Sequence, residues 1–300
     1  MGTEDEQAGA ILVGTAGWAD RDLVASDWYP AAVRTPAGRL EFYAAQFPLV
    51  EVDTTYYAIP REQTVLGWAQ ATCRPGFVMD VKAYSLFTGQ STPVKTLPKE
   101  LRGLARGTWL TAGTVSPDLL DAAWQCFHKT VEPLRQVGRL GLITLQFPAS
   151  YRCDERAADL VGQALAHCAP LQAAVEFRHP SWLRPANREA TLTLLREHDA
   201  AFVCVDMPQG HPDAVPPILA TTTDKAVIRM HGQSPDWRDG NKEERYRYEY
   251  SADELAVWAT RARRLSQHAD EVHVVVNTCC AGAAQRAAAV LRDEIAEAGD

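Results

Sequence analysis

The chain has 300 residues, of which 46% are hydrophobic and 23% are charged, and its formal net charge at pH 7 is −8. This length and composition are typical of a soluble globular protein with one large α/β domain or two average domains. The acidic balance leaves no global electrostatic footprint for duplex DNA, so we do not expect nucleic acid as the partner.

The cysteines and the N-terminal segment indicate a reducing compartment. The seven cysteines are irregularly spaced and include no CxxC pair, which argues against a disulfide framework. Residues 1–10 are acidic and polar and lack the basic start and apolar core of a secretory signal. No apolar run approaches the ~20 residues that span a bilayer. We therefore expect a cytoplasmic protein without a membrane segment, with a flexible N-terminal tail over residues 1–10.

Short apolar runs alternate with helical patterns along the chain. The predicted strands span residues 10–18, 49–57, 76–83, 139–148, 173–179, 200–208, 225–232 and 271–278. The predicted helices span residues 37–47, 61–72, 117–137, 154–168, 188–198, 252–265 and 283–298. Ser116 and Pro117 predict one helix start and Gly138 the end of that helix, and Ser251 with Glu254 predicts a capping box for another.

The alternation of strands and helices predicts the fold. The strand runs are nearly continuous and rich in β-branched residues, as parallel strands buried on both faces should be. Eight such units in a chain of this length predict a single α/β domain, a (β/α)8 TIM barrel over residues 11–292, with a doubly wound open sheet as the alternative. The long connections 83–115 and 232–250 follow strands, so we expect both over the C-terminal mouth, where long loops are usually functional.

Polar side chains lie at the ends of the predicted strands, where barrel enzymes have their active sites. A buried charge costs several kcal/mol unless it is paired, so repeated charges at buried strand ends indicate a shared polar mouth. The candidates for acid and base catalysis are Glu176, Asp206 and His231. The candidates for substrate binding are Trp18, Asp53, Tyr57, Lys82, Gln146, Arg178, His179, Arg229 and Asn277.

Structural roles remain as alternatives at several of these positions. Side chains alternate along a strand, so Glu176 and Arg178 share one face and could form a structural ion pair. Lys82 ends an apolar strand, where a lowered pKa would suit base or Schiff-base chemistry; the alternative is an ion pair with a carboxylate. Asp53 and Asp206 could each cap the loop that follows.

Motifs for several common cofactors are absent. The sequence contains no GxxxxGK[ST], no GxGxxG after a strand and no HExxH. Only His179 and His231 are placed to hold a metal ion, and the neighbouring arginines oppose a cation, so we assign no metal site. The sequence does not identify a cofactor or an oligomeric state. We interpret the adjacent Cys279 and Cys280 as small buried residues, in preference to a metal or redox pair.

The cationic residues of the mouth favour a small anionic ligand, because arginine binds carboxylate or phosphate bidentately. The primary hypothesis is an enzyme that acts on a small anionic or sugar-like substrate by acid/base chemistry. The alternatives are a metal-dependent nucleic-acid-processing barrel and a non-catalytic metabolite-binding protein. We expect that replacing Arg229 with alanine weakens anion binding while the barrel stays folded.

Several sequence blocks occur together over residues 11–292, among them "GTAGWAD", "FYAAQFPLVEVDTTYYAIP", "RLGLITLQFPASY", "VEFRHPSW", "VIRMHG" and "VVNTCCAGAA". In this order they resemble the YecE-like family, domain of unknown function 72. The chain departs from the family pattern at Asp53 and Thr278, where asparagine is usual, and at Gln90, where histidine is frequent. The resemblance implies a barrel fold and no settled reaction, since fold does not determine function.

Overall fold

A computed structural model describes residues 8–72, 74–111 and 114–297. Most of the expected N-terminal tail, residues 1–7, therefore lies outside the described residues. The end of that segment is already structured, because the amide of Gly9 donates to the carbonyl of Ser266 at 2.7 Å and the first strand begins at Ala10.

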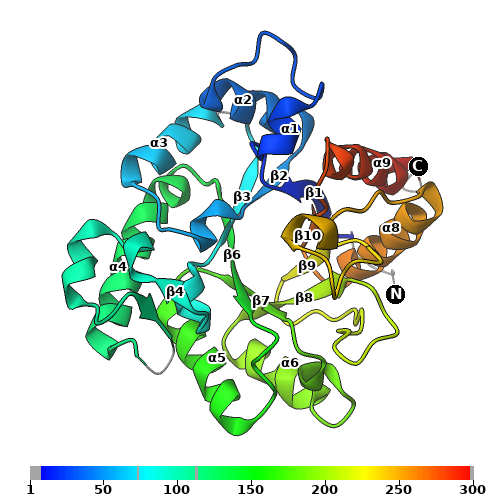
Figure 1. The fold of residues 1–300 in the computed structure, drawn as a ribbon. Helices are drawn as coiled ribbons and strands as arrows, with labels where there is room; N and C mark the ends of the chain where they lie inside the picture. Colours follow the sequence, from blue (N-terminus) through cyan, green and yellow to red (C-terminus); the bar gives the residue numbers. More distant parts are fainter. Residues whose placement is uncertain (1–7, 73, 112–113, 298–300) are drawn as a thin grey trace, which may run out of the picture.

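Eight parallel strands of the described residues form a closed barrel, in the order β1-β10-β9-β8-β7-β6-β3-β2 (Figure 1). The strands are β1 (Ala10–Ala16), β2 (Leu49–Val52), β3 (Val78–Lys82), β6 (Leu140–Phe147), β7 (Ala173–Phe177), β8 (Ala200–Asp206), β9 (Lys225–Met230) and β10 (Glu271–Val276). The predicted (β/α)8 barrel is confirmed, and the alternative of an open sheet is wrong.

Helices connect the strands, and those of ten residues or more surround the barrel, because each has one apolar stripe that needs a sheet to cover it. They are α1 (Arg21–Ala25), α2 (Pro36–Gln46), α3 (Glu62–Ala71), α4 (Pro117–Gln136), α5 (Glu155–Cys168), α6 (Arg188–Glu197), α7 (Lys242–Arg245), α8 (Ala252–Ser266) and α9 (Ala283–Glu297). The predicted caps are confirmed: the Ser116 side chain accepts from the amide of Leu119, and Ser251 with Glu254 forms the capping box of α8. Among the described residues, no helix is long and apolar enough to cross a bilayer.

The predicted strands all continue past the ends of the observed strands, by five residues at β2 and by one or two residues elsewhere. β2 ends at Val52, and Thr54–Tyr56 form the 3-10 helix η1. The Thr55 hydroxyl bends the chain here, because it donates to the carbonyls of Val52 and Lys82. β7 likewise ends at Phe177, before the 3-10 helix η5 (Pro180–Leu183).

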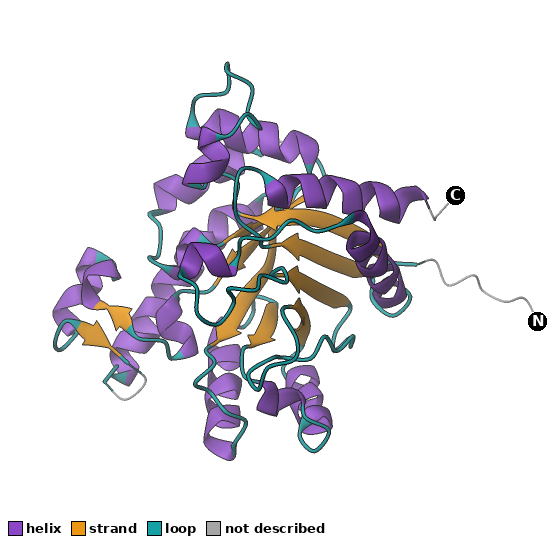
Figure 2. Ribbon diagram, turned by 45° about the vertical axis from the view of Figure 1, so that its right-hand side comes forward, coloured by secondary structure: helices purple, strands orange, loops and turns teal. Residues whose placement is uncertain are grey.

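The two long connections differ in position. Connection 83–115 holds the 3-10 helices η2 (Ser85–Thr88), η3 (Val94–Thr96) and η4 (Lys99–Leu104) and the antiparallel pair β4 (Thr92–Pro93) and β5 (Trp109–Leu110). Most of it lies beside α4, away from the barrel axis (Figure 2), so its expected position over the mouth is wrong except near Gln90. Connection 232–250 does cover the mouth, and we call it the cover segment.

The amino-terminal part of the barrel interior contains a buried ionic group, the floor network of Asp80, Lys225, Glu271 and His273. The His273 ring nitrogens lie 2.8 Å from Asp80 Oδ2 and 2.7 Å from Glu271 Oε1, and Glu271 Oε1 lies 3.2 Å from Lys225 Nζ. Burial alone would lower the pKa of His273, but the two carboxylates raise it to about 9. His273 is therefore a buried imidazolium that donates from both nitrogens.

Candidate functional site

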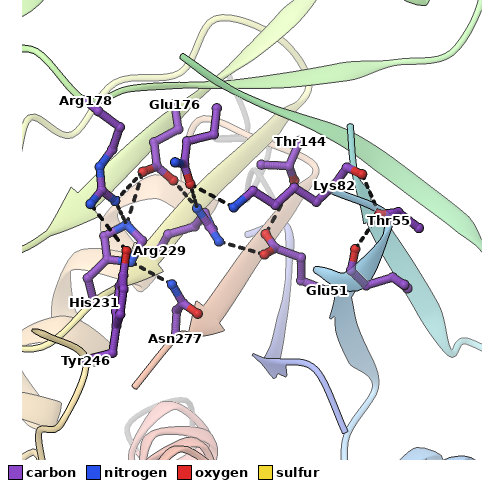
Figure 3. Close-up of polar contacts among 12 residues, drawn as sticks. Glu51, Thr55, Lys82, Thr144, Glu176, Arg178, Arg229, His231, Tyr246 and Asn277 are labelled. Atoms are coloured by element: carbon purple, nitrogen blue, oxygen red, sulfur yellow. Dashed lines mark hydrogen bonds and ion pairs between the residues drawn. The ribbon is translucent and has the colours of Figure 1, made fainter. Parts of the chain in front are cut away.

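Arg229 on β9 is the centre of a second ionic group, at the carboxyl end of the barrel (Figure 3). Its guanidinium donates to Glu51 Oε1 on β2 at 2.6 Å and to Glu176 on β7, and it approaches Gln146 Oε1 on β6 at 3.3 Å. The side chain is 1% exposed. We call this group the mouth network. Its members are Glu51, Lys82, Gln146, Glu176, Arg178, Arg229, His231 and Asn277.

Glu176 is fully enclosed by nitrogen donors. Its Oε1 accepts from Arg178 at 2.8 Å and lies 3.2 Å from His231 Nε2, while Oε2 accepts from Arg229. Burial would raise the pKa of this carboxyl, but Arg229, His231 and Arg178 hold it well below its usual range. Glu176 is therefore a permanent carboxylate at neutral pH.

His231 is buried with both ring nitrogens occupied. Nδ1 lies 2.9 Å from the Asn277 amide nitrogen, and Nε2 faces Glu176 and also lies 3.0 Å from an Arg178 nitrogen. Because the amide nitrogen donates, Nδ1 is the acceptor and the proton lies on Nε2 toward Glu176. Burial, together with the two arginines, lowers the pKa of His231 to about 3, so the imidazole is neutral at physiological pH.

Lys82 ends β3 beside this group and is only half-buried. Its Nζ donates to Gln146 Oε1 at 2.9 Å and lies 4.6 Å from the centre of the Tyr56 ring. Burial lowers the pKa of Lys82 to about 8, and the neighbouring Arg229 adds to this effect. The amine therefore has a sizeable neutral fraction near physiological pH.

Glu51 balances Arg229 from the other side and has the opposite tendency to Glu176. It is 1% exposed, and its Oε2 lies 3.5 Å from the Thr144 hydroxyl. Burial raises the pKa of Glu51 despite the attraction of Arg229. The mouth network thus has one carboxyl that stays ionised and one that takes up a proton more readily.

The cover segment closes over Arg178. The guanidinium carbon lies 5.3 Å from the centre of the Trp237 ring, and one terminal nitrogen donates to the Tyr246 hydroxyl at 3.4 Å. The Arg178 side chain is 15% exposed, whereas that of Glu176 beneath it is 0% exposed. Arg178 is thus the guanidinium of the network that solvent, or a ligand, can reach.

Comparison with known proteins identifies the family of this chain. A family model described as "Protein of unknown function DUF72" matches residues 12–300. The chain belongs to this family. The resemblance inferred from the sequence blocks is therefore confirmed.

The chain is similar to one relative of known sequence and to DUF72 family proteins of known structure. The UPF0759 protein YunF of Bacillus subtilis (strain 168) is 27% identical over 279 residues, which is 91% of this chain and 90% of the relative. A DUF72 family protein of Thermotoga maritima MSB8 is 29% identical with a TM-score of 0.76, covering 96% of this chain and 99% of its own. One from Enterococcus faecalis V583 is 24% identical with a TM-score of 0.76, covering 95% and 97%.

Asp206 lies outside the mouth network of this DUF72 protein. Its carboxylate accepts from the Tyr250 hydroxyl and the Gln233 amide instead. The reason is the register: Val205, one residue earlier, pairs with Arg229 and so shares its inward face, which turns Asp206 outward toward α8. Burial raises the pKa of Asp206, but the expected grouping of Asp206 with Glu176 and His231 is wrong.

Other candidates are also placed apart. Trp18 packs edge-on against Trp68 of α3, with ring centres 5.7 Å apart, and His179 Nδ1 lies 2.7 Å from Ser181 Oγ, where the ring caps η5. Asp53 is half-buried and its charge adds to the raised pKa of Glu51. Tyr57 is 48% exposed at the rim. Arg229 is too deeply buried for the direct ligand contact that we expected of it.

Sequence reasoning missed Glu51, Thr144 and Tyr246. Glu51 had a signal, a glutamate inside the otherwise apolar run "LVEV", but Thr144 and Tyr246 had none. Gln90 also reaches the site, because its amide nitrogen donates to the Gln146 carbonyl at 3.1 Å and its side-chain oxygen accepts from Tyr56.

Two further observations bear on the ligand. Within the described ranges, no three His, Cys, Asp or Glu side chains are grouped to hold a metal ion. A cavity of about 230 Å³ lies outside the barrel, between α4 and α5, with Trp124, Phe147 and Leu160 among its lining residues. That cavity is mainly apolar, so the mouth network, which has the cationic groups, is the candidate site for an anionic ligand.

Proposed function

We propose that this protein is an enzyme that acts on a small anionic or sugar-like substrate at the barrel mouth. In this proposal Lys82 transfers the proton and Arg178 binds the anionic group. The observation that carries the proposal is the state of Lys82, a half-buried amine whose pKa is lowered to about 8 and whose hydrogen-bond partner is the neutral amide of Gln146. A general base works best when its pKa lies near the operating pH.

Glu176 and His231 have different roles in this proposal from those expected from the sequence. Glu176 is 0% exposed with three nitrogen donors around it, and His231 is 0% exposed with both nitrogens occupied. Neither can reach a substrate proton without losing a buried partner, which typically costs about 1–3 kcal/mol. We assign both as positioning residues that hold Arg178.

The charge of the mouth supports an anionic substrate. Arg178 and Lys82 are the partly accessible cations, and the carboxylates of Glu176 and Glu51 face Arg229 below them. Because its pKa is raised, Glu51 takes up a proton more readily than an ordinary glutamate. Its protonation makes the mouth more positive by one charge. Trp237 and Tyr246 add flat surfaces beside Arg178, of the kind that stack on sugar rings or aromatic groups.

A ligand screen with paired variants tests this proposal. Phosphate, sulfate, sugar phosphates and sugar acids are compared with neutral sugars and divalent metals by thermal shift, and stabilising compounds are then assayed for turnover. We expect anions to stabilise the protein and Arg178→Gln to weaken their binding roughly ten- to a hundred-fold, because a charged hydrogen bond contributes about 1.5–3 kcal/mol. Lys82→Gln keeps the contact with Gln146 and should lower kcat about 10²–10⁴-fold with little change in binding.

The outcomes separate the alternatives. In the wild type, activity should rise with pH through about 8, where Lys82 loses its proton, and Lys82→Gln should remove that dependence. Anion binding without any turnover supports the non-catalytic metabolite-binding alternative. Stabilisation by divalent metals alone, unchanged in Arg178→Gln, contradicts the proposal and favours the metal-dependent barrel.

A further inference from the structure

Cys279 and Cys280 lie just after β10, with their sulfur atoms 3.2 Å apart. Both are free thiols and both are half-buried. The interpretation of this pair as small buried residues is therefore wrong. They are also near the candidate site, because Asn277, two residues before Cys279, contacts His231.

The backbone places the two sulfurs side by side. In an extended chain, neighbouring side chains point in opposite directions. Here the φ angle is +88° at Cys280 and +46° at Ala281, left-handed values that non-glycine residues rarely adopt. Such strained positions persist only where the surroundings impose them, and they cluster at functional sites. The sulfurs must approach by about 1 Å to form a disulfide bond of about 2.05 Å, and the short Cα separation of adjacent residues strains the resulting ring and makes it easy to reduce.

We infer that Cys279 and Cys280 form a vicinal dithiol site that a low-molecular-weight disulfide oxidises. The thiolate of Cys280 attacks the external disulfide, forms a mixed disulfide and releases one small thiol. The thiolate of Cys279 then attacks the Cys280 sulfur, closes the protein disulfide and releases the second small thiol. The protein loses two hydrogen atoms, and its two electrons reduce the external disulfide.

The Cys279 thiol donates its proton to the carbonyl of Glu243 at 3.1 Å, which leaves Cys280 as the attacking sulfur. Burial raises the pKa of Cys279 to about 12, and the neighbouring Cys280 adds to this effect. Cys279 is therefore a thiol at neutral pH, which is a poor nucleophile. Once Cys280 is in a mixed disulfide it no longer has a thiol, so its contribution to the raised pKa of Cys279 is removed and the second step becomes easier.

Oxidation would act on the cover segment, because Cys279 is one of its attachment points. The Cys279 sulfur donates to the carbonyl of Glu243 at 3.1 Å, and the Cys279 amide donates to the carbonyl of Tyr246 at 2.7 Å. Forming the disulfide draws the sulfur away from Glu243 and uses up its proton. We therefore expect the cover segment to loosen over the mouth, whether or not the proposed enzyme activity is correct.

The direct test is mass spectrometry after incubation of the folded protein with oxidised glutathione. Cleavage after Arg264 and Arg286 gives one peptide, residues 265–286, that contains Cys279 and Cys280 and no other cysteine. We expect this peptide to lose two hydrogen atoms and dithiothreitol to restore them. Cys204, which is buried with 1% exposure, serves as the internal control for unfolding and should stay unmodified.

Two variants and one second readout complete the test. Cys279→Ser should retain a stable mixed disulfide at residue 280, whereas Cys280→Ser should react much more slowly. Hydrogen exchange of the peptide amides in residues 236–247 should become several-fold faster on oxidation of the wild type and should not change in Cys280→Ser. Two unreacted thiols, or a mixed disulfide that persists in the wild type without ring closure, would overturn the inference.

Discussion

The barrel interior contains two ionic groups that differ in how completely their charges are paired. In the floor network, His273 lies between Asp80 and Glu271, and Lys225 completes the group. Both histidine nitrogens donate to carboxylates, which raises the pKa of His273 to about 9. The floor network therefore satisfies its own charges.

The mouth network also combines a histidine, a lysine and carboxylates, but it adds two arginines and two amides. His231 shares one carboxylate, Glu176, with two arginines, and its pKa is lowered to about 3. Lys82 and Arg178 have partial exposure at its upper edge. Charge inside a barrel is therefore not by itself evidence of a site. Both networks have displaced pKa values and a partly exposed cation. The mouth differs because Lys82 donates to the amide of Gln146, whereas Lys225 in the floor pairs with the carboxylate of Glu271.

Replacement of Arg229 should give the largest difference in stability between the two networks. Arg229→Met fills the space but leaves Glu51 and Glu176 buried without their shared cation, so we expect a loss of about 3–5 kcal/mol in the free energy of unfolding, measured by urea denaturation. This replaces our sequence-based expectation that the barrel tolerates loss of Arg229. The matched change in the floor, Lys225→Met, removes a cation that is 26% exposed and should cost roughly 1 kcal/mol or less. Equal losses would contradict the contrast.

The stability of the protein should decrease at alkaline pH, because His273 loses its proton there. Because its pKa is raised to about 9, its contribution is complete below the unfolded value of about 6.5 and is lost as the pH rises through 9. The loss should be on the order of 3 kcal/mol in the wild type. His273→Gln keeps hydrogen-bonding capacity and should show a flatter profile over this range; an unchanged slope would mean that His273 is not the group responsible.

His231 should have the opposite dependence. Its pKa is lowered to about 3, so below pH 6.5 the unfolded chain takes up a proton that the folded chain does not. Stability from this group is complete above about 6.5 and should fall by about 1.4 kcal/mol per pH unit as the pH decreases. Denaturation at pH 6.5 and 5.5 measures the effect, and His231→Gln should reduce it. A slope that His231→Gln leaves unchanged would mean that folding does not lower the pKa of His231.

Replacement of Asp206 should have the smallest effect on stability. It also tests whether Asp206 belongs to the mouth network. Asp206→Asn alters contacts with Tyr250 and Gln233 only, so we expect a loss of about 1 kcal/mol in stability and no change in anion binding by thermal shift. The comparison is Glu176→Gln, which removes the carboxylate that pairs with Arg178 and one of the two that pair with Arg229, and which should change both stability and anion binding. Weaker anion binding in Asp206→Asn would extend the site to Asp206.

Local patterns in the sequence are sufficient to predict the class of fold and the end of the barrel where the site lies. Eight apolar runs with helical patterns between them require parallel strands covered on both faces, and this periodicity is a local property. Apart from Glu51, the members of the mouth network were found in the same way, because each stands where an apolar run ends. They are Lys82, Gln146, Glu176, Arg178, Arg229, His231 and Asn277.

Which of these residues contact one another depends on the three-dimensional arrangement of the strands. Glu51 and Arg229 are 178 residues apart in the chain and join across the barrel interior. Asp206 and Arg229 both end strands, yet the register turns one outward and the other inward. Protonation depends on the same arrangement: His231 and His273 are both fully buried histidines of the barrel interior, and the number of carboxylates around each sets the opposite directions of their pKa shifts. Charges act over a few ångströms in space, and the spacing of residues along the chain does not give those distances.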